Sequence, residues 1–494
     1  MNNLLRTAYC LAIATTVAAQ EPIDQATLAR IRDEGLNRSQ VGATFNHLTN
    51  VIGARLTGSA PFKQAADWSA AQLRTNGLKN VHLESWPFGR GWALKRFVFE
   101  MVEPRYVPLV GYPEGWTPST KGELLGAPVF IGNLADSSAV RAQAARLRGA
   151  IVLATEPQQA FIVKDRIEPS LSETPVPIGA PPFINARSPM PTRALGTMLS
   201  ELGAGVVLRP SQGQHGTMFV LGNRATPSTA VPTVIVQAEQ YNMIVNAMQA
   251  GTPVKLRVGV QAEYQTADTN GYNVIAEIPG TDPTLSSEIV LVGAHLDSWH
   301  SATGATDNAD AAASLIEAMR ILQTLNLKPR RTIRMALWGG EEQGLLGSKA
   351  YAQAHFAAPA NGGAAREKLS LYLNSDPGSG PIYGWYMEEN APAKSLFDAW
   401  LAPLQDLGMR RNVMSKIGNT DHLSFLGLGA PSFNSLQDYV EYDVREHHTN
   451  ADFADRVSVP DLKQNAIVLA TFAWLAATRE QKVPGPVTSA APVP

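Results

Sequence analysis

Residues 289–297 read IVLVGAHLD, and residues 333–342 read IRMALWGGEE. The first stretch is apolar up to Ala294, the second is apolar up to Trp338 except for Arg334, and both end in histidine or carboxylate residues. A short run that is apolar throughout is typical of a strand buried on both faces, as in a parallel sheet. The two stretches therefore predict buried parallel strands that carry polar groups at their carboxyl ends.

Strands and helices alternate on both sides of these stretches. Further strands are expected at residues 332–338, 369–373 and near 432–436, and helices at 309–325, 345–354, 393–407 and 461–476. This alternation predicts an α/β fold in which helices cover both faces of a mostly parallel sheet. Ligands of such folds bind beyond the carboxyl ends of the strands.

The middle of the chain has a different texture. Short β-rich runs are joined by long segments rich in Pro, Gly and Ser, notably residues 168–191. We expect a separate β-rich module over residues 107–261, inserted into the first domain. Residues 20–106 and 262–480 would then form the two parts of that domain, and the Pro-rich tail 481–494 would be disordered after Lys482.

Composition limits the class of protein. A chain of 494 residues favours two or three domains, and 45% hydrophobic with 17% charged residues is typical of a globular protein. A net charge of -2 without a basic stripe argues against a nucleic-acid partner. The sequence also contains no apolar run of about 20 residues, so we expect no transmembrane segment.

The N-terminus is typical of a secretory signal peptide. Arg6 precedes an apolar run over residues 8–17, and Ala18 and Ala19 offer a small-residue cleavage site. We expect cleavage after residue 19 and a secreted or periplasmic protein; the alternative is a frayed N-terminal helix. The single cysteine, Cys10, lies inside this segment. A mature chain without cysteine would have to build a zinc site from His and carboxylate groups.

Histidine and carboxylate residues follow several of the expected strands. They are His295 and Asp297, Glu341 and Glu342, Asp376 in LYLNSD, Asp307 in TGATDNAD, and His447 and His448 in EHHTNAD. These groups meet only if the strands are parallel, because only then do the strand ends share one edge of the sheet.

Two pairs indicate metal chemistry. His295 and Asp297 are two residues apart at a strand end, and a metal-bound imidazole usually donates its other N–H to a carboxylate, a role that Asp297 fits. Glu341 and Glu342 would repel each other unless one ligates a metal and the other takes a proton from the metal-bound water. The alternatives are a solvated Asp beside a strand-end histidine and a solvated acidic turn.

Two further aspartates have alternative roles. Asp307 could cap the following helix, but Asn308 or Asp310 could also do so, which would leave Asp307 free to bridge two cations. Asp376 precedes Pro377 and could either ligate a metal or open a turn.

The series HLD, GATDN, GGEE, NSD and HHTNAD resembles the co-catalytic zinc exopeptidases of clan MH. The segment IRDEGLNRSQV…HLTNVIGARLTGS, within residues 31–59, is similar to their carboxypeptidase Q branch, which carries an inserted protease-associated domain. The resemblance covers nearly the whole mature chain. It implies a zinc-exopeptidase (phosphorylase/hydrolase-like) three-layer αβα domain with a mostly parallel mixed sheet.

The resemblance also implies a role for each site residue. Two Zn²⁺ ions per subunit would be held by His295 and Asp376, by Glu342 and His448, and by Asp307 as the bridge. Glu341 would be the general acid/base, and Asp297 the carboxylate behind His295. The family often has a cis peptide after the bridging aspartate, and some members are homodimers.

Two positions follow from the family's spacing. His448 is preferred to His447 as the ligand because it directly precedes Thr449 and lies four residues before Asp452. The segment NTDHLSF, with Asp421 and His422, is similar to a loop on the substrate side of the site. His300 is close enough in sequence to be a candidate substrate contact, whereas ordinary roles are expected for His47, His82, His215 and His355.

The sequence thus predicts a secreted di-zinc exopeptidase that hydrolyses the peptide bond next to a free terminus of short peptides. A hydroxide bridging the two ions would attack, and Glu341 would move the proton. Aminopeptidase, carboxypeptidase and dipeptidase remain open. The alternatives from other classes are a non-catalytic binding ectodomain and an amidohydrolase or glutaminyl cyclase on the same scaffold.

Overall fold

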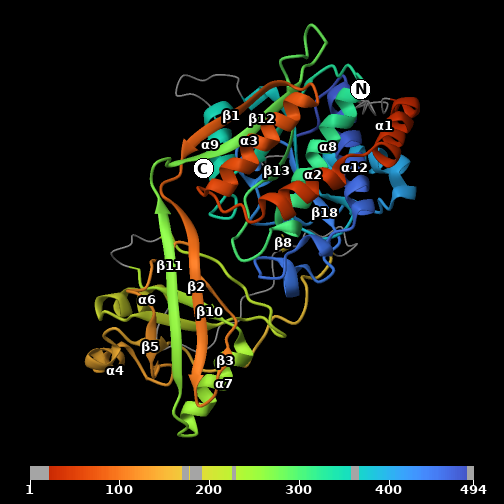
Figure 1. Ribbon diagram of the computed structural model, residues 1–494. Coiled ribbons are helices and arrows are strands. Elements are labelled where there is room, and N and C mark those ends of the chain that lie inside the picture. The colour runs from red at the N-terminus through yellow and green to blue at the C-terminus, as the bar shows by residue number, and fades with distance from the viewer. Residues whose placement is uncertain (1–21, 170–176, 179–191, 225–229, 358–365, 487–494) are drawn as a thin grey trace, which may run out of the picture.

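The protein forms a larger body and a smaller, elongated one (Figure 1). The computed structural model describes residues 22–169, 177–178, 192–224, 230–357 and 366–486. The signal peptide expected over residues 1–19 lies outside these ranges. Two long antiparallel strands, β2 (Gly91–Glu103) and β11 (Lys255–Gln265), run from the larger body through the smaller one.

A seven-stranded sheet is the centre of the larger body. Its strands are, in spatial order, β1 (Lys79–Pro87), β12 (Asn270–Ile278), β14 (Thr332–Trp338), β13 (Ile289–His295), β15 (Leu369–Asn374), β18 (Ser432–Gln437) and β16 (Ile382–Tyr386). The four strands β14, β13, β15 and β18 are parallel. β12 and β16 pair antiparallel with β14 and β18, and β1 pairs antiparallel with β12. The predicted α/β fold with a mostly parallel mixed sheet is therefore confirmed.

Helices cover both faces of this sheet because successive strand residues point to opposite sides. In β13, Val290 and Val292 belong to the core of one face, whereas Ile289 and Leu291 belong to the core of the other. The first core includes residues of α1 (Gln25–Asn37), α2 (Val41–Asn46), α3 (Ala60–Thr75), α8 (Asp310–Thr324), α10 (Ala391–Leu401) and α12 (Val459–Thr478). The second includes residues of α9 (Leu346–His355) and α11 (His422–Leu426).

The apolar runs predicted most of these elements, but one helix ends earlier than expected and three elements, α11, β12 and β16, were not predicted. The helix expected at residues 393–407 ends at Leu401 and continues as a tighter turn over Ala402–Leu407, which has Pro403 in its first turn. The strands β12 and β16 both pair antiparallel at the flanks of the parallel strands, where tertiary pairing decides the conformation.

The smaller body has two sheets and its own core. One sheet consists of β4 (Gly111–Pro113), β10 (Thr233–Val236), β9 (Val206–Pro210), β7 (Ile151–Leu153) and β6 (Val129–Phe130). The other consists of β3 (Val107–Pro108), β2, β11 and β5 (Leu124–Gly126), and the helices are α4 (Ser137–Arg141), α5 (Ala144–Leu147), α6 (Thr192–Glu201) and α7 (Ala238–Gln249). Phe99, Leu208, Tyr241 and Leu256 join both sheets and α7 in one buried cluster.

Two further segments of the chain are relevant to its boundaries. The expected disorder after Lys482 differs from the structure for residues 483–486: Val483 is buried, and Pro484 O accepts a hydrogen bond from Asn390 Nδ2 at 2.9 Å. Residues 487–494 lie outside the described ranges. Across the described chain, none of the helices combines the length and the apolar character needed to span a bilayer.

Gly293→Ala tests the close packing around β13. A Cβ at this position would lie 2.4 Å from Tyr372 Oη and 2.7 Å from Trp338 Nε1, two atoms that are hydrogen-bonded to each other. We expect a loss of about 1–3 kcal/mol in the free energy of unfolding, measured by urea denaturation. Gly126→Ala is the control because its Cβ would meet nothing within 4 Å, so the change should stay within about 1 kcal/mol. Equal stability of the two variants would contradict this packing.

Candidate metal centre

The carboxyl ends of three parallel strands bring the predicted residues together. His295 is the last residue of β13, Glu341 and Glu342 follow β14 after a Gly–Gly turn, and Asp376 comes two residues after β15. Because β14, β13 and β15 are parallel neighbours, these residues emerge at one edge of the sheet. All of their side chains are buried.

Loops supply the other two candidates. Asp307 lies in the turn η3 (Ala305–Ala309), which leads into α8, and its φ of -130° and ψ of 80° leave the helical conformation. The Asp307–Asn308 peptide bond is cis, as the resemblance implied. His448 comes two residues after the turn η6 (Tyr442–Glu446) and has a φ of +63°, which is uncommon for a residue other than glycine.

The two carboxylate oxygens of Asp307 face two different histidines. Its Oδ1 lies 3.2 Å from His295 Nε2, and its Oδ2 lies 3.5 Å from His448 Nε2. Asp376 Oδ1 is 3.8 Å from the same nitrogen of His295, and Glu342 Oε2 is 2.9 Å from the same nitrogen of His448. The residues thus form two half-sites that share Asp307.

Burial and mutual repulsion shift the pKa values in this cluster. Burial raises the pKa values of Glu341 and Glu342 well above the ordinary range, and neighbouring carboxylates raise them further. Burial alone would lower the pKa of His295, but the surrounding carboxylates, Glu341 foremost, raise it well above its usual value. The cluster therefore gathers buried acidic groups whose ionised form is costly, and a bound cation would offset that cost.

Several buried polar atoms of the cluster have no hydrogen-bond partner among the described residues: Asp307 Oδ2, Glu342 Oε1 and His448 Nδ1. Buried polar atoms are normally paired, so these three need an explanation. Two sets of atoms lie within 4.8 Å of one another, one from His295, Asp307 and Asp376 and one from Asp307, His447 and His448. Imidazole and carboxylate groups in this arrangement suit divalent ions such as zinc.

Asp297 supports His295 and the Gly–Gly–Glu–Glu turn from the buried side of the site. It is fully buried, and its carboxylate accepts hydrogen bonds from Thr57 Oγ1 at 2.8 Å and from the backbone N–H of Glu341 at 3.2 Å. His295 Nδ1 lies 3.0 Å from the backbone oxygen of Asp297 and 3.6 Å from its Oδ1. The aspartate therefore orients both the histidine and the Gly–Gly–Glu–Glu turn.

Two positioning residues were not predicted from the sequence. The fully buried Arg55 donates hydrogen bonds to the backbone oxygens of Leu296, Thr303 and Gly304, each at 2.7 Å, and so fixes the loop between His295 and Asp307. Asp452 accepts hydrogen bonds from Thr306 N at 2.7 Å and from Asp307 N at 3.2 Å. Burial raises the pKa of Asp452 to about 7.

The neighbouring histidines differ in their surroundings. His447 stacks on Tyr442, with ring centroids 5.1 Å apart, and its Nδ1 lies 3.8 Å from Asp443 Oδ1. Burial lowers the pKa values of both His447 and His448. His448 is the one that lies close to Glu342, so the geometry favours His448 as the ligand, while His447 remains near enough to be tested.

His300 and His422 have partners outside this cluster, whereas Asp421 is close enough to raise the pKa of Glu341. His300 is packed among aromatic rings, and its Nε2 lies 2.8 Å from Pro113 O in the smaller body. His422 Nε2 lies 3.3 Å from Glu388 Oε1. Asp421 is fully buried, and burial raises its pKa to about 7.

The four histidines for which ordinary roles were expected have partners outside this cluster. His47 stacks on Trp68, His82 Nδ1 lies 2.7 Å from Asn80 O, and His355 Nε2 lies 2.9 Å from a carboxylate oxygen of Glu84. The backbone N–H of His215 donates a hydrogen bond to Glu239.

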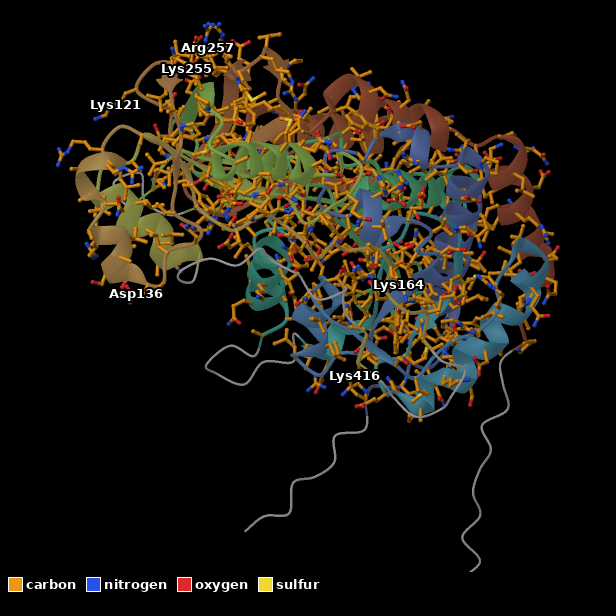
Figure 2. The ribbon with its side chains drawn as sticks, turned by 90° about the horizontal axis from the view of Figure 1, so that it is seen from below. Lys121, Asp136, Lys164, Lys255, Arg257 and Lys416 are labelled. Carbon is orange, nitrogen blue, oxygen red and sulfur yellow. The ribbon has the colours of Figure 1, made fainter. Side chains whose placement is uncertain are left out.

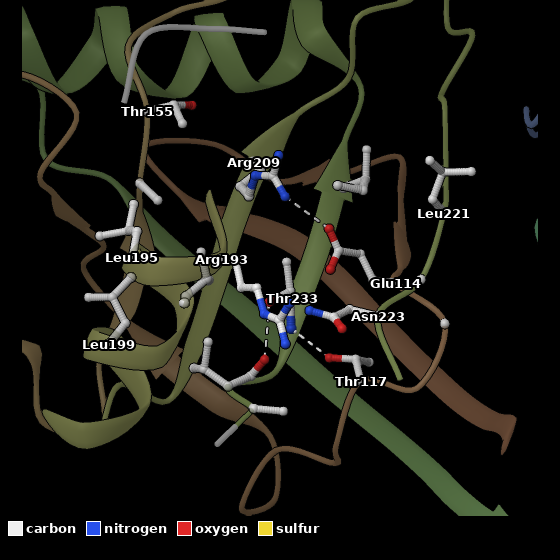
Figure 3. Close-up of a pocket in the computed structure, with 18 of the residues that line it drawn as sticks. Glu114, Thr117, Thr155, Arg193, Leu195, Leu199, Arg209, Leu221, Asn223 and Thr233 are labelled. Atoms are coloured by element: carbon white, nitrogen blue, oxygen red, sulfur yellow. Dashed lines mark hydrogen bonds and ion pairs between the residues drawn. The ribbon is translucent and has the colours of Figure 1, made fainter. Parts of the chain in front are cut away.

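A cavity of about 690 Å³ lies in the smaller body, apart from these residues. Figure 3 shows Glu114 and Arg209 pointing toward each other in its wall, and their atoms are 3.0 Å apart. The pair neutralises its own charge, and the cavity wall contains none of the candidate ligands. A much smaller pocket, lined by Trp299, Asp307 and His448 among others, opens at the candidate metal centre.

The comparisons with known proteins point to the same chemistry. Residues 273–473, which contain every candidate ligand, match Peptidase family M28. This stretch of the chain is therefore similar to the peptidases of family M28. Carboxypeptidase Q from Bos taurus is 26% identical over 446 residues, which cover 88% of this chain and 85% of that protein. The peptidase domain and the smaller body are therefore both included in this likeness.

Solved structures extend the likeness to the fold. The Peptidase M28 precursor from Shewanella amazonensis has a TM-score of 0.69 and 26% identity, and the match covers 94% of this chain and 99% of that one. BSAP, a zinc aminopeptidase from Bacillus subtilis, has a TM-score of 0.60 and 18% identity, with 89% and 95% covered. At 18% identity, the likeness to BSAP shows a shared fold and no more.

Proposed function

We propose that the chain is an exopeptidase that uses two zinc ions to hydrolyse the peptide bond next to a free terminus of short peptides. The observation that carries this proposal is the position of Asp307, whose two oxygens face His295 and His448 separately. A carboxylate between two half-sites is suited to bridging two cations. The neighbouring buried acids supply the negative charge that two dications need.

The residues fit two ions in the following way. One half-site would be His295 and Asp376, the other Glu342 and His448, with Asp307 shared between them. When bound, the two ions would supply Lewis acidity for the scissile carbonyl and would lower the pKa of a water molecule to about 7. The protein's own contribution is to hold these ligands at fixed places on the edge of the sheet.

Glu341 is proposed as the group that moves the proton. Its side chain is buried, and the raised pKa that burial gives it suits a carboxylate that accepts a proton from water and passes it to the leaving amine. Its backbone N–H is held by Asp297, so this residue would act as a positioning group for both Glu341 and His295.

Short peptides with a free terminus are the proposed substrates. The likeness to carboxypeptidase Q extends over most of both chains and therefore includes both bodies, which favours this branch. We propose further that residues 107–261 correspond to an inserted protease-associated domain, that residues 1–19 direct export to the periplasm or the outside of the cell, and that the chain can form a homodimer. Nothing in the site indicates a nucleic-acid partner.

Metal removal and peptide digestion test the proposal together. A mixed set of di- and tripeptides, with N-blocked and C-blocked controls, would be digested and analysed by mass spectrometry. We expect loss of turnover in a chelator, recovery with zinc, and no cleavage of peptides whose required terminus is blocked. Turnover of amides or N-terminal glutamine without peptide cleavage would favour the amidohydrolase or cyclase alternative, and zinc binding without any turnover would favour a binding ectodomain.

Glu341→Gln tests the proton carrier. The amide has nearly the same shape but cannot accept the proton, so we expect zinc content to remain and kcat to fall by about 10²–10⁴-fold. Glu263→Gln, in an exposed ion pair with Lys95 in the smaller body, should retain full activity. Wild-type turnover by Glu341→Gln would remove this residue from the mechanism.

The two adjacent histidines give a matched test of the ligand set. Because His448 Nε2 is 2.9 Å from Glu342 and faces Asp307, His448→Ala should lose one of two zinc ions. His447→Ala should keep both ions. Metal content would be measured by plasma mass spectrometry after dialysis, and the reverse result would make His447 the ligand.

A further inference from the structure

Two segments of the smaller body reach the loop that carries His448. Asp165 and Arg166 belong to the first segment, and residues 216–220 form the second. Figure 2 shows the neighbouring Lys164 over the larger body, far from Lys121 and Asp136 at the end of the smaller body. The smaller body therefore contacts the candidate metal centre through the loop at residues 441–450.

Asp165 caps the short helical turn that precedes the two histidines. Its carboxylate accepts hydrogen bonds from the backbone N–H groups of Glu441, Asp443 and Val444 at 2.9, 3.0 and 3.1 Å. The side chain of Glu441, the residue at the start of the turn, makes no capping hydrogen bond of its own. The groups left free at a helix start are thus satisfied by a residue more than 270 positions away.

Arg166 forms a buried, two-pronged ion pair with Asp443. Its Nη2 lies 2.6 Å from Oδ1, its Nε lies 2.8 Å from Oδ2, and the two side chains are 5% and 2% exposed. The guanidinium group also lies 4.8 Å from the ring centroid of Tyr439 and 5.3 Å from that of Tyr442. A bidentate arginine fixes orientation as well as position.

The second segment holds the other end of the loop. Val220 N donates a hydrogen bond to His448 O at 2.9 Å, and Asn450 N donates to Met218 O at 3.1 Å. Asn450 Oδ1 in turn accepts a hydrogen bond from Met218 N at 2.6 Å. The loop is therefore paired like the edge of a sheet, with Phe219 opposite Thr449.

A series of ring contacts connects Arg166 to the two histidines. Tyr442, against the Arg166 guanidinium, stacks on His447, and the His447 and His448 rings follow with centroids 3.7 Å apart. Held at both ends and packed ring on ring, His448 has little freedom to leave its place near Glu342. Groups that orient a metal-bound histidine from behind typically change metal affinity or activity by about 10–100-fold when they are replaced.

We propose that Asp165 and Arg166 are positioning residues that set the zinc affinity of the half-site formed by Glu342 and His448. The smaller body would thereby complete one half of the metal centre. This inference rests on the proposed function, because it requires two zinc ions to bind.

The test uses the full-length zinc-loaded protein and the double variant Arg166→Met/Asp443→Asn, which removes both buried charges together and leaves neither uncompensated. Zinc affinity would be measured by competition with a chelator, ion by ion. We expect one zinc ion to bind about 10–100-fold more weakly and the other to be unchanged. Excess zinc should restore kcat, with KM close to that of the wild type.

Two further variants keep the test interpretable. Arg166→Lys retains the charge but loses the second hydrogen bond to Asp443, so it should weaken the binding of the same zinc ion to a smaller extent. This variant also provides a test if the double variant does not fold. Arg141→Met/Glu201→Gln is the matched control. Arg141 and Glu201 form the same type of ion pair in the smaller body, but their side chains are 56% and 55% exposed and lie far from the loop at residues 441–450. It should bind both ions as the wild type does.

The outcomes separate the inference from the proposed function. Wild-type protein with fewer than two zinc ions would remove the proposed function and this inference with it. His448→Ala with both ions would remove His448 as a ligand, and therefore this inference, but would leave the proposed function standing with His447 as the ligand. If the wild type holds two ions and His448→Ala holds one, unchanged zinc affinity in both Arg166 variants overturns the inference alone. Equal weakening of both ions with a lower melting temperature would also overturn it, because the pair would then act through overall stability.

Discussion

Repulsion among buried acids is the constraint on which this site depends. Asp307, Glu341, Glu342 and Asp376 share one small region at the edge of a sheet, where water cannot screen their charges. Burial raises the pKa values of the two glutamates, and Asp307 responds in the opposite direction because His295 compensates for its burial. Burying several acids together costs free energy, and bound cations would offset that cost. The fold maintains this arrangement because the acids are attached to three separate segments: the turn after β14 carries Glu341 and Glu342, the turn η3 carries Asp307, and Asp376 follows β15.

The surrounding structure fixes the backbone rather than the ligand atoms themselves. Arg55 binds three carbonyl groups of the loop between His295 and Asp307, and Asp452 binds the N–H groups of Thr306 and Asp307. Asp297 does the same for the turn that carries the two glutamates. The lone pairs that would face an ion therefore remain free, while the main chain beneath them is held.

The sequence predicted the strand ends well because their signal is local. The stretch IVLVGAHLD predicts both the buried strand and the polar residues that follow it. Parallel pairing of β13 with β15 then brings His295 and Asp376 to the same edge of the sheet. Arg55, Asp165 and Arg166 could not be found in this way. Their partners at the site lie 241 to 279 positions away, and although Arg55 lies in the segment that is similar to the carboxypeptidase Q branch, nothing in that segment indicates those partners. The antiparallel strands β12 and β16 were missed for the same reason, since pairing with distant segments determines them.

The capping of the turn before His448 has a consequence for how the chain can be divided. A protein reduced to residues 273–473 would contain every candidate ligand but would lack Arg55, Asp165, Arg166 and the segment that pairs with residues 448–450. The turn would begin with unsatisfied N–H groups, and Asp443 would be left as an uncompensated acid. The structural unit that supports this candidate metal centre is therefore larger than residues 273–473, and loss of the smaller body would remove the contacts that hold the loop at residues 441–450.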